Sequence, residues 1–419
     1  MAKTPSLKQE IASILACAPA KRAKGIIDSP HTRQILEQLP PQEAYLVIKE
    51  SWGMDSQILL QYMPAETVCN LIDLDCWDKD SLSVNSVIEW LQELSYTSTD
   101  ILLETIETID VEILVMVFQS AFQVVHVRPT DEHIPDLLDE GYESIDNTYF
   151  FKVTTEEEWT PFLKDILSVL FTRNHDLYVT ILESVMYELP SCLEETSYEK
   201  RSLRLMELGF PRPEDALDVY RRVSLDTLLD QGIRKDKTPV VTKHLHMLPD
   251  RYIDQFSKAP SVLAEALERA NEPTRERFIY EMVYLTNKVV MADYKPLNDA
   301  EALRASMEKA GSLCTLGLHV AVRTRGVDGD TVLATTNAET LFSLGYNSVL
   351  AVQQRLKRVL DDVERSMVPE RVRDIADGLL RKRPLYKERE FSSLEELDEV
   401  NREMDRLEAM AAMAKSVDW

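Results

Sequence analysis

The pair of histidines closest together in the sequence is His244 and His246. Imidazole nitrogens are common ligands of zinc and other transition metals. Two residues two positions apart on a helix point about 200° away from each other, so a helical pair cannot chelate one ion, whereas a pair on a strand could. Because the pair leads into Leu248 and Pro249 in a helical context, we assign no metal site to it.

A second candidate for metal chemistry is an acidic loop that contains no Lys or Arg. Its members are Asp131, Glu132, Asp136, Asp139, Glu140, Glu143 and Asp146. Carboxylate oxygens of this kind could collect Mg²⁺ or Ca²⁺. The loop lacks the alternating Asp/Asn spacing and the central Gly of a formed calcium loop, so a solvated acidic connection is favoured and Mg²⁺ binding stays the alternative.

A basic island near the C-terminus contrasts with the acidic body of the chain. It consists of Arg371, Arg373, Arg381, Lys382, Arg383, Lys387 and Arg389. Such a group could dock on anionic lipid, on nucleic acid or on the protein's own acidic loop. The interpretation we favour is that these cations meet the negative end of a helix dipole.

The cysteines do not indicate disulfides or a nucleophile. They are odd in number, scattered and without a Cys-x-x-Cys pair, which is typical of reduced thiols in a reducing compartment: Cys17, Cys69, Cys76, Cys192 and Cys314. Asp75, Cys76 and Trp77 adjoin, but no His-supported nucleophile can be argued around Cys76. We expect a buried structural Cys beside a packing Trp.

No phosphate-binding loop, dinucleotide fingerprint, nucleophile elbow, zinc-protease helix or EF-hand motif occurs. Glycine, which such loops require, numbers only 11 in 419 residues. We therefore assign no catalytic, cofactor-binding or metal-ligating residue, and we expect a non-catalytic protein, with an enzyme using an unrecognised site as an alternative.

Charge and hydropathy restrict the partners. The net charge is 47 − 72 = −25, which repels phosphate backbones and favours cationic partners, so nucleic acid is not expected as a partner. No apolar run approaches the ~18 residues of a membrane span. The apolar stretch 11–16 before Cys17 is too short for a secretion signal. A cytoplasmic protein is expected.

A repeat of 23 residues organises the first part of the chain. Its markers are Glu43, Glu66, Glu89 and Glu112. Proline is tolerated at the start of a helix, a first-turn Glu suits the positive end of the dipole, and Ser86 with Glu89 forms a capping box. Apolar residues two and five positions after each Glu share one helical face. The pattern predicts four stacked helical units, with helices that start near Pro41, Pro64, Ser86 and Asp110.

Residues 122–158 break this pattern. The segments 122–127 and 148–153 are rich in β-branched and aromatic residues and predict two short paired strands. A capping box at Thr155 and Glu158 then predicts that a helix restarts there. From Pro161 to about residue 310 the apolar period is helical, with prolines bounding the helices, and a long helix is predicted from Ala338 to Met367.

The last segment, 392–415, carries a coiled-coil-like seam. Its apolar positions are Leu397, Val400, Met404, Leu407, Ala411 and Ala414. Three heptads ending in alanines bury little apolar area, so we expect the seam to pack on the chain's own body in a monomer rather than to form a dimer.

Two resemblances bear on the fold. Leu39–Ala44 and Met63–Glu66 resemble the Leu-Pro-x-Glu repeats in the cytosolic N-terminal domain of MgtE magnesium transporters, an armadillo-like right-handed superhelix related to the flagellar switch protein FliG. Over nearly the whole chain, segments such as 45–50, 73–77, 205–211 and 380–386 resemble an uncharacterised bacterial family, domain of unknown function 6178. This resemblance implies a fold and no activity.

The sequence therefore predicts a mainly all-α protein with a right-handed helical superhelix at the N-terminus, a helical body and one small β-hairpin near 122–153. We expect an MgtE-N-like repeat at 1–120, a β-containing acidic insertion at 121–158, a helical domain at 159–390 and a C-terminal helix at 391–419. The function we expect is a non-catalytic scaffold or adaptor that binds a protein partner through a concave helical surface. A divalent-cation-responsive regulator is the alternative from a different class.

Overall fold

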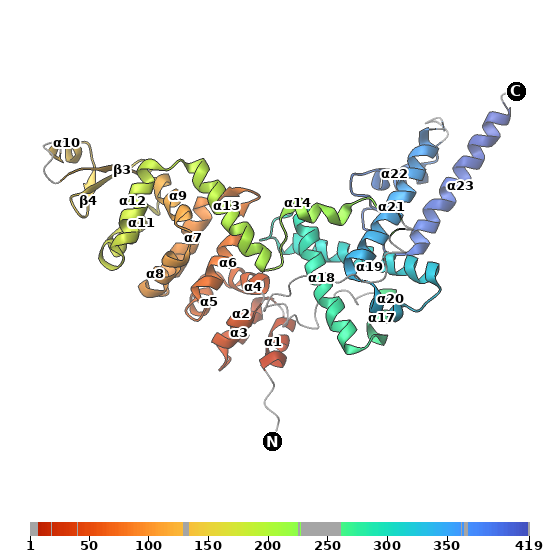
Figure 1. The fold of residues 1–419 in the computed structure, drawn as a ribbon, viewed down its shortest axis with the longest axis horizontal. Coiled ribbons are helices and arrows are strands. Elements are labelled where there is room, and N and C mark those ends of the chain that lie inside the picture. Colours follow the sequence, from red (N-terminus) through yellow and green to blue (C-terminus); the bar gives the residue numbers. More distant parts are fainter. Residues whose placement is uncertain are drawn as a thin grey trace, which may run out of the picture. The chain divides into compact units, whose positions relative to one another are not determined.

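The computed structural model describes residues 7–17, 19–39, 41–128, 134–224, 227, 261–361, 363 and 368–417. It is 72% helical, and the part of the chain that it describes contains 21 α-helices and two small sheets, which confirms the mainly all-α prediction. Contacts divide the chain into two compact units (Figure 1). Unit 1 is Met1–Leu208 with Pro296–Asn298, and unit 2 is Gly209–Lys295 with Asp299–Trp419. The four-segment division at 120, 158 and 390 stays a prediction.

Unit 1 opens with nine short helices: α1 (Leu7–Ala16), α2 (Pro19–Ile27), α3 (Thr32–Gln38), α4 (Pro41–Glu50), α5 (Met54–Leu60), α6 (Ala65–Asp75), α7 (Val84–Ser95), α8 (Thr99–Thr108) and α9 (Val111–Ala121). From α4 onward, each of these helices packs on neighbours one or two places along the chain: α4 on α6, α5 on α7, α6 on α8 and α7 on α9. Helices of this length cannot bury their apolar faces alone, so each face is shared with its neighbours.

The four predicted helix starts are confirmed. Helix α4 begins at Pro41, α6 and α9 begin one residue after Pro64 and Asp110, and α7 begins at Val84, two residues before Ser86. The capping box at Ser86 is wrong, however. The N-cap of α7 is Ser83, whose hydroxyl accepts a hydrogen bond from the Ser86 amide at 3.4 Å. Both positions are serine, and the chain leaves its extended conformation three residues earlier than the Glu spacing indicated.

Two small sheets interrupt the helices. The first pairs β1 (Trp77–Asp78) with β2 (Ser81–Leu82) and has no signal in the sequence pattern, because each strand is only two residues long. The second pairs β3 (Phe122–His126) with β5 (Tyr149–Val153) in antiparallel register, as predicted. A third strand, β4 (Glu143–Ser144), pairs with the other side of β5, so the element is a three-stranded sheet rather than a hairpin.

The remainder of unit 1 contains the helices α10 (Ile134–Asp139), α11 (Thr160–Arg173), α12 (His175–Tyr187) and α13 (Pro190–Glu207). Both α12 and α13 pack on α9, and α13 also packs on α6. The predicted capping box at Thr155 is wrong. Helix α11 begins at Thr160 without a side-chain cap, and the Thr160 hydroxyl instead accepts a hydrogen bond from the Glu157 amide at 3.0 Å.

Unit 2 is helical in its described residues: α14 (Pro213–Ala216), the 3₁₀ turn η1 (Leu217–Tyr220), α17 (Val262–Arg269), α18 (Glu272–Ala292), α19 (Ala300–Arg325), α20 (Gly329–Thr335), α21 (Ala338–Asp361), α22 (Glu370–Leu379) and α23 (Leu394–Val417). Its centre is the contact between α19 and α21, on which α18 and α23 pack. Gly317 and Gly345 lie where these two helices meet, and the backbone carbonyls of Leu341 and Leu313 fill the space that a Cβ on Gly317 and on Gly345 would need. The resulting core is continuous over unit 2.

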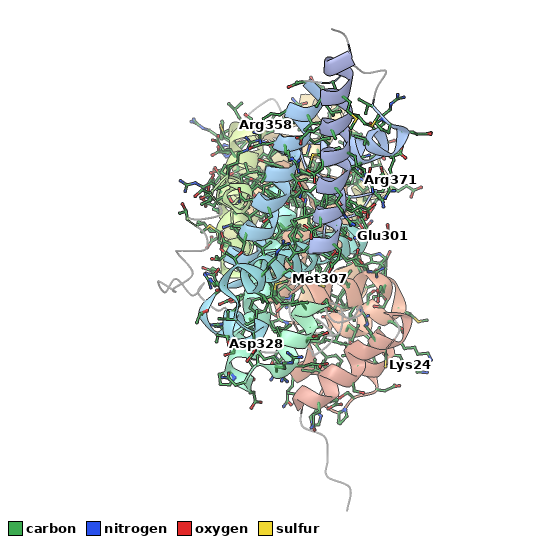
Figure 2. All side chains as sticks on the ribbon, turned by 90° about the vertical axis from the view of Figure 1, so that its right-hand side faces the viewer. Lys24, Glu301, Met307, Asp328, Arg358 and Arg371 are labelled. Atoms are coloured by element: carbon green, nitrogen blue, oxygen red, sulfur yellow. The ribbon has the colours of Figure 1, made fainter. Side chains whose placement is uncertain are left out.

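The C-terminal seam lies against this core. Leu397, Val400, Met404 and Leu407 are buried within the single chain, whereas Arg402 and Arg406 are exposed. Helix α23 packs on α19, α21 and α22, and Figure 2 shows it alongside α21. Packing of the seam on the body is thus confirmed. The side chains of Ala411 and Ala414 lie outside the described residues.

Candidate functional sites

An exposed apolar stripe on α5 is the first candidate site. Met54 and Ile58 lie on α5 and Tyr62 lies two residues after its end, and they are 81%, 38% and 46% exposed. Trp52, which precedes the helix, is 37% exposed. The opposite face of α5 is buried through Ser56, Leu59 and Leu60. Single exposed apolar residues are ordinary, but four large ones within eleven positions form a patch of the kind that marks protein interfaces.

The structure holds this stripe in place from beneath. The ring of Trp52 packs edge-on against buried Trp90, with 4.9 Å between the ring centroids. The Lys49 ammonium lies 4.3 Å from the centroid of the Trp52 ring. At the start of α5, the buried Glu93 carboxylate accepts hydrogen bonds from the Ser56 hydroxyl and, at 3.1 Å, from the Gly53 amide. Since buried hydrogen-bonded networks rigidify their surroundings, the stripe is a fixed surface rather than a loose loop.

The stripe belongs to a strongly acidic stretch. Residues 50–127 contain 14 Asp and Glu but only one Lys and no Arg. Part of this charge is balanced from later helices, because Arg204 binds Asp73 and Asp110, and Lys200 binds Glu112. Other carboxylates are exposed and have no basic partner within the described residues: Asp55, Glu66, Glu89 and Glu104. This part of unit 1 therefore presents a negative potential.

Asp75 is a structural hub rather than a reactive group. Its carboxylate accepts hydrogen bonds from the Tyr45 hydroxyl at 2.8 Å, the Trp90 indole at 2.8 Å and the Lys49 ammonium at 3.0 Å. Burial acts to raise the pKa of Asp75, but these donors outweigh it and the pKa is lowered. Burial raises the pKa of the neighbouring Cys76 thiol well above its usual value, so this Cys is a buried, inert residue, as predicted.

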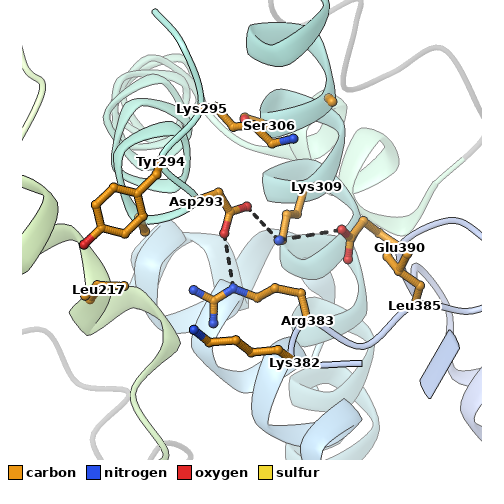
Figure 3. Close-up of a pocket in the computed structure, with 12 residues that line it drawn as sticks. Leu217, Asp293, Tyr294, Lys295, Ser306, Lys309, Lys382, Arg383, Leu385 and Glu390 are labelled. Atoms are coloured by element: carbon orange, nitrogen blue, oxygen red, sulfur yellow. Dashed lines mark hydrogen bonds and ion pairs between the residues drawn. The ribbon is translucent and has the colours of Figure 1, made fainter. Parts of the chain in front are cut away.

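A polar cavity in unit 2 is the second candidate site (Figure 3). Its volume is about 450 Å³, within the range of small-molecule sites. It lies where the end of α18, the first half of α19 and the segment after α22 meet. Its charged lining residues are Asp293, Lys295, Lys309, Lys382, Arg383 and Glu390. Four cations thus face two carboxylates in a protein that is acidic overall.

A chain of ion pairs forms one wall of the cavity. The buried Lys309 ammonium lies 2.8 Å from Asp293 Oδ2 and 3.8 Å from Glu390 Oε1. The second oxygen of Asp293, Oδ1, accepts from Arg383 Nε at 3.2 Å. Burial raises the pKa of Glu390, with Lys309 acting in the opposite direction. These pairs fix both carboxylates in place.

The guanidinium of Arg383 is fixed on a second side. Its carbon lies 3.4 Å from the ring centroid of Tyr220, so the planar group stacks on the ring. Only Nε is engaged by Asp293. Within the described residues, the two Nη atoms have no acceptor, and the ammonium groups of Lys295 and Lys382 have no anionic partner. The cavity therefore holds donors without acceptors.

Most of the predicted basic island is paired within the chain. The partners are neither a helix dipole nor the acidic loop, the two internal partners that the sequence suggested. Arg371 and Lys387 bind Glu399 of α23, and Arg389 binds Glu396. The other internal contacts of the island join Arg381 to Glu388, Arg383 to Asp293, and Arg373 to the Val368 carbonyl. Lys382 is the member of the island that has neither an ion pair nor a side-chain hydrogen bond within the described residues, and it lines the cavity. Its neighbours in the sequence give no sign that it differs from the paired members.

The structure does not arrange the candidate metal ligands of the sequence analysis as a site in the residues that it describes. His244 and His246 lie outside the described residues, as do Asp131 and Glu132. Within the acidic segment, Asp146 closes a turn by accepting from the Thr148 and Tyr149 amides at 2.8 Å. Among the residues with a described position, no three His, Cys, Asp or Glu side chains gather closely enough to hold a metal ion.

The comparisons with known proteins place the chain in a family. The family model described as "Family of unknown function (DUF6178)" matches residues 1–418. The chain belongs to this family. Neither the curated proteins nor the solved structures give a match, and no finding supports the resemblance to the MgtE transporters. In the described part of the chain, every helix is too short or too polar to span a membrane.

Proposed function

We propose that the protein is a non-catalytic adaptor that binds a basic, amphipathic segment of a partner protein on the α5 face of unit 1. The observation that carries the proposal is the exposed stripe of Trp52, Met54, Ile58 and Tyr62. A large aromatic residue fixed from below and flanked by flexible methionine is typical of surfaces that receive an apolar helix.

The charge of the surrounding stretch selects the partner's chemistry. Fourteen carboxylates against one lysine over residues 50–127 attract a cationic segment and repel an acidic one. An amphipathic helix with Leu on one face and Lys or Arg on the other satisfies both the apolar stripe and the carboxylates. The helices of unit 1, in our reading a repeat of armadillo-like type in a cytoplasmic bacterial protein, supply the rigid support for such a surface.

A synthetic Leu/Lys amphipathic peptide tests this proposal by fluorescence anisotropy. The probe is expected to bind the full-length chain more tightly than a Leu/Glu peptide of the same length. The double variant Met54→Lys/Ile58→Lys should weaken binding roughly tenfold or more, since it removes the apolar contacts and adds like charge. The matched control is Tyr187→Lys/Leu189→Lys, which adds the same charge at two other exposed apolar positions of unit 1.

Equal loss of binding in both double variants would show a nonspecific charge effect and overturn the assignment to α5. Unchanged binding in both double variants would also overturn it, because the apolar stripe would then not contribute to binding. If the wild-type protein binds the peptide only after a segment of its own chain is deleted, that segment covers α5 and the partner assignment is overturned.

A further inference from the structure

We propose that the cavity of unit 2 binds a small phosphate monoester, with Lys382 and the Nη atoms of Arg383 as the groups that hold the phosphate. This site is separate from the proposed partner surface, since every residue that lines it belongs to unit 2. The proposal rests on three features: unpaired donors, a charge imbalance and an apolar flank.

The unpaired donors come first. Arg383 is oriented by Asp293 through Nε and by the ring of Tyr220 beneath it, which leaves the outer edge of the guanidinium free. Holding a guanidinium in this way leaves two parallel N–H groups, the geometry that matches two oxygens of a phosphate. Lys382 adjoins it in the chain, and Lys295, on the other side of Asp293 beside Ser306, adds positive charge to the cavity but no direct contact with the phosphate (Figure 3).

The charge imbalance indicates a dianion. The four cations and two carboxylates of the lining leave two positive charges uncompensated, those of Lys295 and Lys382 within the described residues. Lys309 does not contribute to this excess, because Asp293 and Glu390 bind it. A phosphate monoester carries a charge of about −1.5 to −2 at neutral pH and offers three acceptor oxygens, which matches the free donors in number and charge.

The organic part of the ligand has a place beside the donors. Leu217, Ala292, Ala305 and Leu385 line the cavity together with Tyr294. Tyr294 has a left-handed backbone, with φ of 51°, directly after α18, where Gly or Asn is usual. A bulky residue held in this conformation beside a cavity is a feature that clusters at ligand sites. Figure 3 shows Tyr294 and Leu217 together on one side of the cavity and the ion pairs beyond them.

Calorimetric titration of the full-length protein with phenyl phosphate tests the proposal, with inorganic phosphate and succinate as comparison ligands. Phenyl phosphate should bind with a submillimolar Kd and inorganic phosphate more weakly, because it lacks the apolar part. Lys382→Met should weaken binding roughly tenfold, the usual effect of removing one charge-assisted contact. Arg383→Lys should also weaken binding, since it keeps the charge but loses the paired Nη donors.

The matched control is Lys357→Met, which removes one exposed lysine of α21 that does not line the cavity. Its Kd should equal that of the wild type, and circular dichroism should show that all variants keep their helicity. The absence of binding by the wild type up to about 10 mM phenyl phosphate overturns the site. Equal Kd values for Lys382→Met and Lys357→Met do so as well. Succinate that binds as tightly as phenyl phosphate overturns the assignment to phosphate.

Discussion

At the scale of single residues, the charged side chains of this protein divide by whether their partners are complete. Asp75, Asp73 and Glu399 each accept several hydrogen bonds and hold helices together. Lys382 and Lys295 have no such partner within the described residues and line a cavity. Because an ion held on all sides has little capacity for a ligand, the incomplete groups are the ones that carry the functional proposal.

Asp75→Asn tests the role of the charged side chains whose partners are complete. The substitution keeps the shape of the side chain but removes the charge and one acceptor for Tyr45, Lys49 or Trp90. Leaving one of these partly buried donors unsatisfied should lower the free energy of unfolding by about 2 kcal/mol, measured by urea denaturation. The matched control is Asp78→Asn, at an exposed position without a side-chain partner in the described structure, which should change stability by less than about 0.5 kcal/mol. Equal effects of the two variants would contradict the role of Asp75.

Glu399 provides a test by pH. Hydrogen bonds from Tyr386 at 2.7 Å and Arg371 at 2.8 Å lower its pKa to about 2. A carboxyl whose pKa is depressed on folding stabilises the protein above its unfolded pKa, and that contribution is lost as the pH falls toward 2. Glu399→Gln should therefore lower the free energy of unfolding by roughly 1 kcal/mol at pH 7.

The difference between wild type and Glu399→Gln should narrow steadily as the pH is lowered from about 5 toward 2. The control is Glu388→Gln, because Glu388 pairs with Arg381 on the surface, where its side chain is 77% exposed. Its effect should be small at every pH, as for other exposed ion pairs. A pH-independent loss in Glu399→Gln would show that the contact, and not the charge, stabilises α23.

At the scale of elements, the helices differ in how closely they approach. The crossing of α19 and α21 is the closest contact that the glycines reveal, with Gly317 facing Leu341 and Gly345 facing Leu313. A β-carbon on Gly317 would overlap the carbonyl oxygen of Leu341, and one on Gly345 would overlap that of Leu313. The backbone rather than a side chain occupies that space, so it cannot move away without separating the helices.

Gly317→Ala and Gly345→Ala should therefore each cost about 3 kcal/mol or more, in spite of the higher helix propensity of Ala. Gly25→Ala is the matched control, because Gly25 lies within α2 and a β-carbon there meets only Ile14 at ordinary distances of 3.5 and 3.6 Å. It should be neutral or stabilise by up to about 1 kcal/mol. Thermal melting of the three variants measures the contrast. A Gly317→Ala variant as stable as Gly25→Ala would rule out the close crossing.

Elements with local signals were predictable from the sequence. Pro41 and Pro64 with a following Glu mark helix starts because first-turn chemistry is local, and the residues of β3 and β5 favour strands on their own. The N-cap of α7 was missed because Ser83 and Ser86 offer the same hydroxyl. The cavity had no signal at all: Asp293, Lys309 and Glu390 come together only through the packing of α18, α19 and the segment after α22.

At the scale of the whole molecule, the net charge of −25 is unevenly distributed. Residues 50–127 of unit 1 carry fourteen carboxylates and one lysine, whereas the cavity of unit 2 has an excess of two cations. A chain that is anionic overall repels small anions at long range. A phosphate monoester would therefore be recognised only at short range, and its Kd should depend less on ionic strength than binding of a basic peptide to unit 1.

The two units also predict how the chain folds. Unit 2 has its own continuous core, and the helices of unit 1 bury their apolar faces on one another. We expect residues 1–208 and 209–419, produced separately, each to be helical and to melt cooperatively, as measured by circular dichroism and calorimetry. The cut removes Pro296–Asn298 from unit 1, and with it the buried side chain of Leu297 and the hydrogen bonds that join Asn298 to Asp75 and Tyr45. The hydrogen bonds are exposed or only partly buried, whereas Leu297 is buried, so the cut should cost unit 1 about 2 to 3 kcal/mol, most of it from the lost leucine. Leu297→Ala in the full chain measures the larger part of that cost, and Asn298→Ala measures the side-chain hydrogen bond to Asp75 but not the bond that the Asn298 backbone carbonyl accepts from Tyr45. If the 1–208 fragment is unfolded while Leu297→Ala and Asn298→Ala have little effect, unit 1 depends on more of the chain than its own helices.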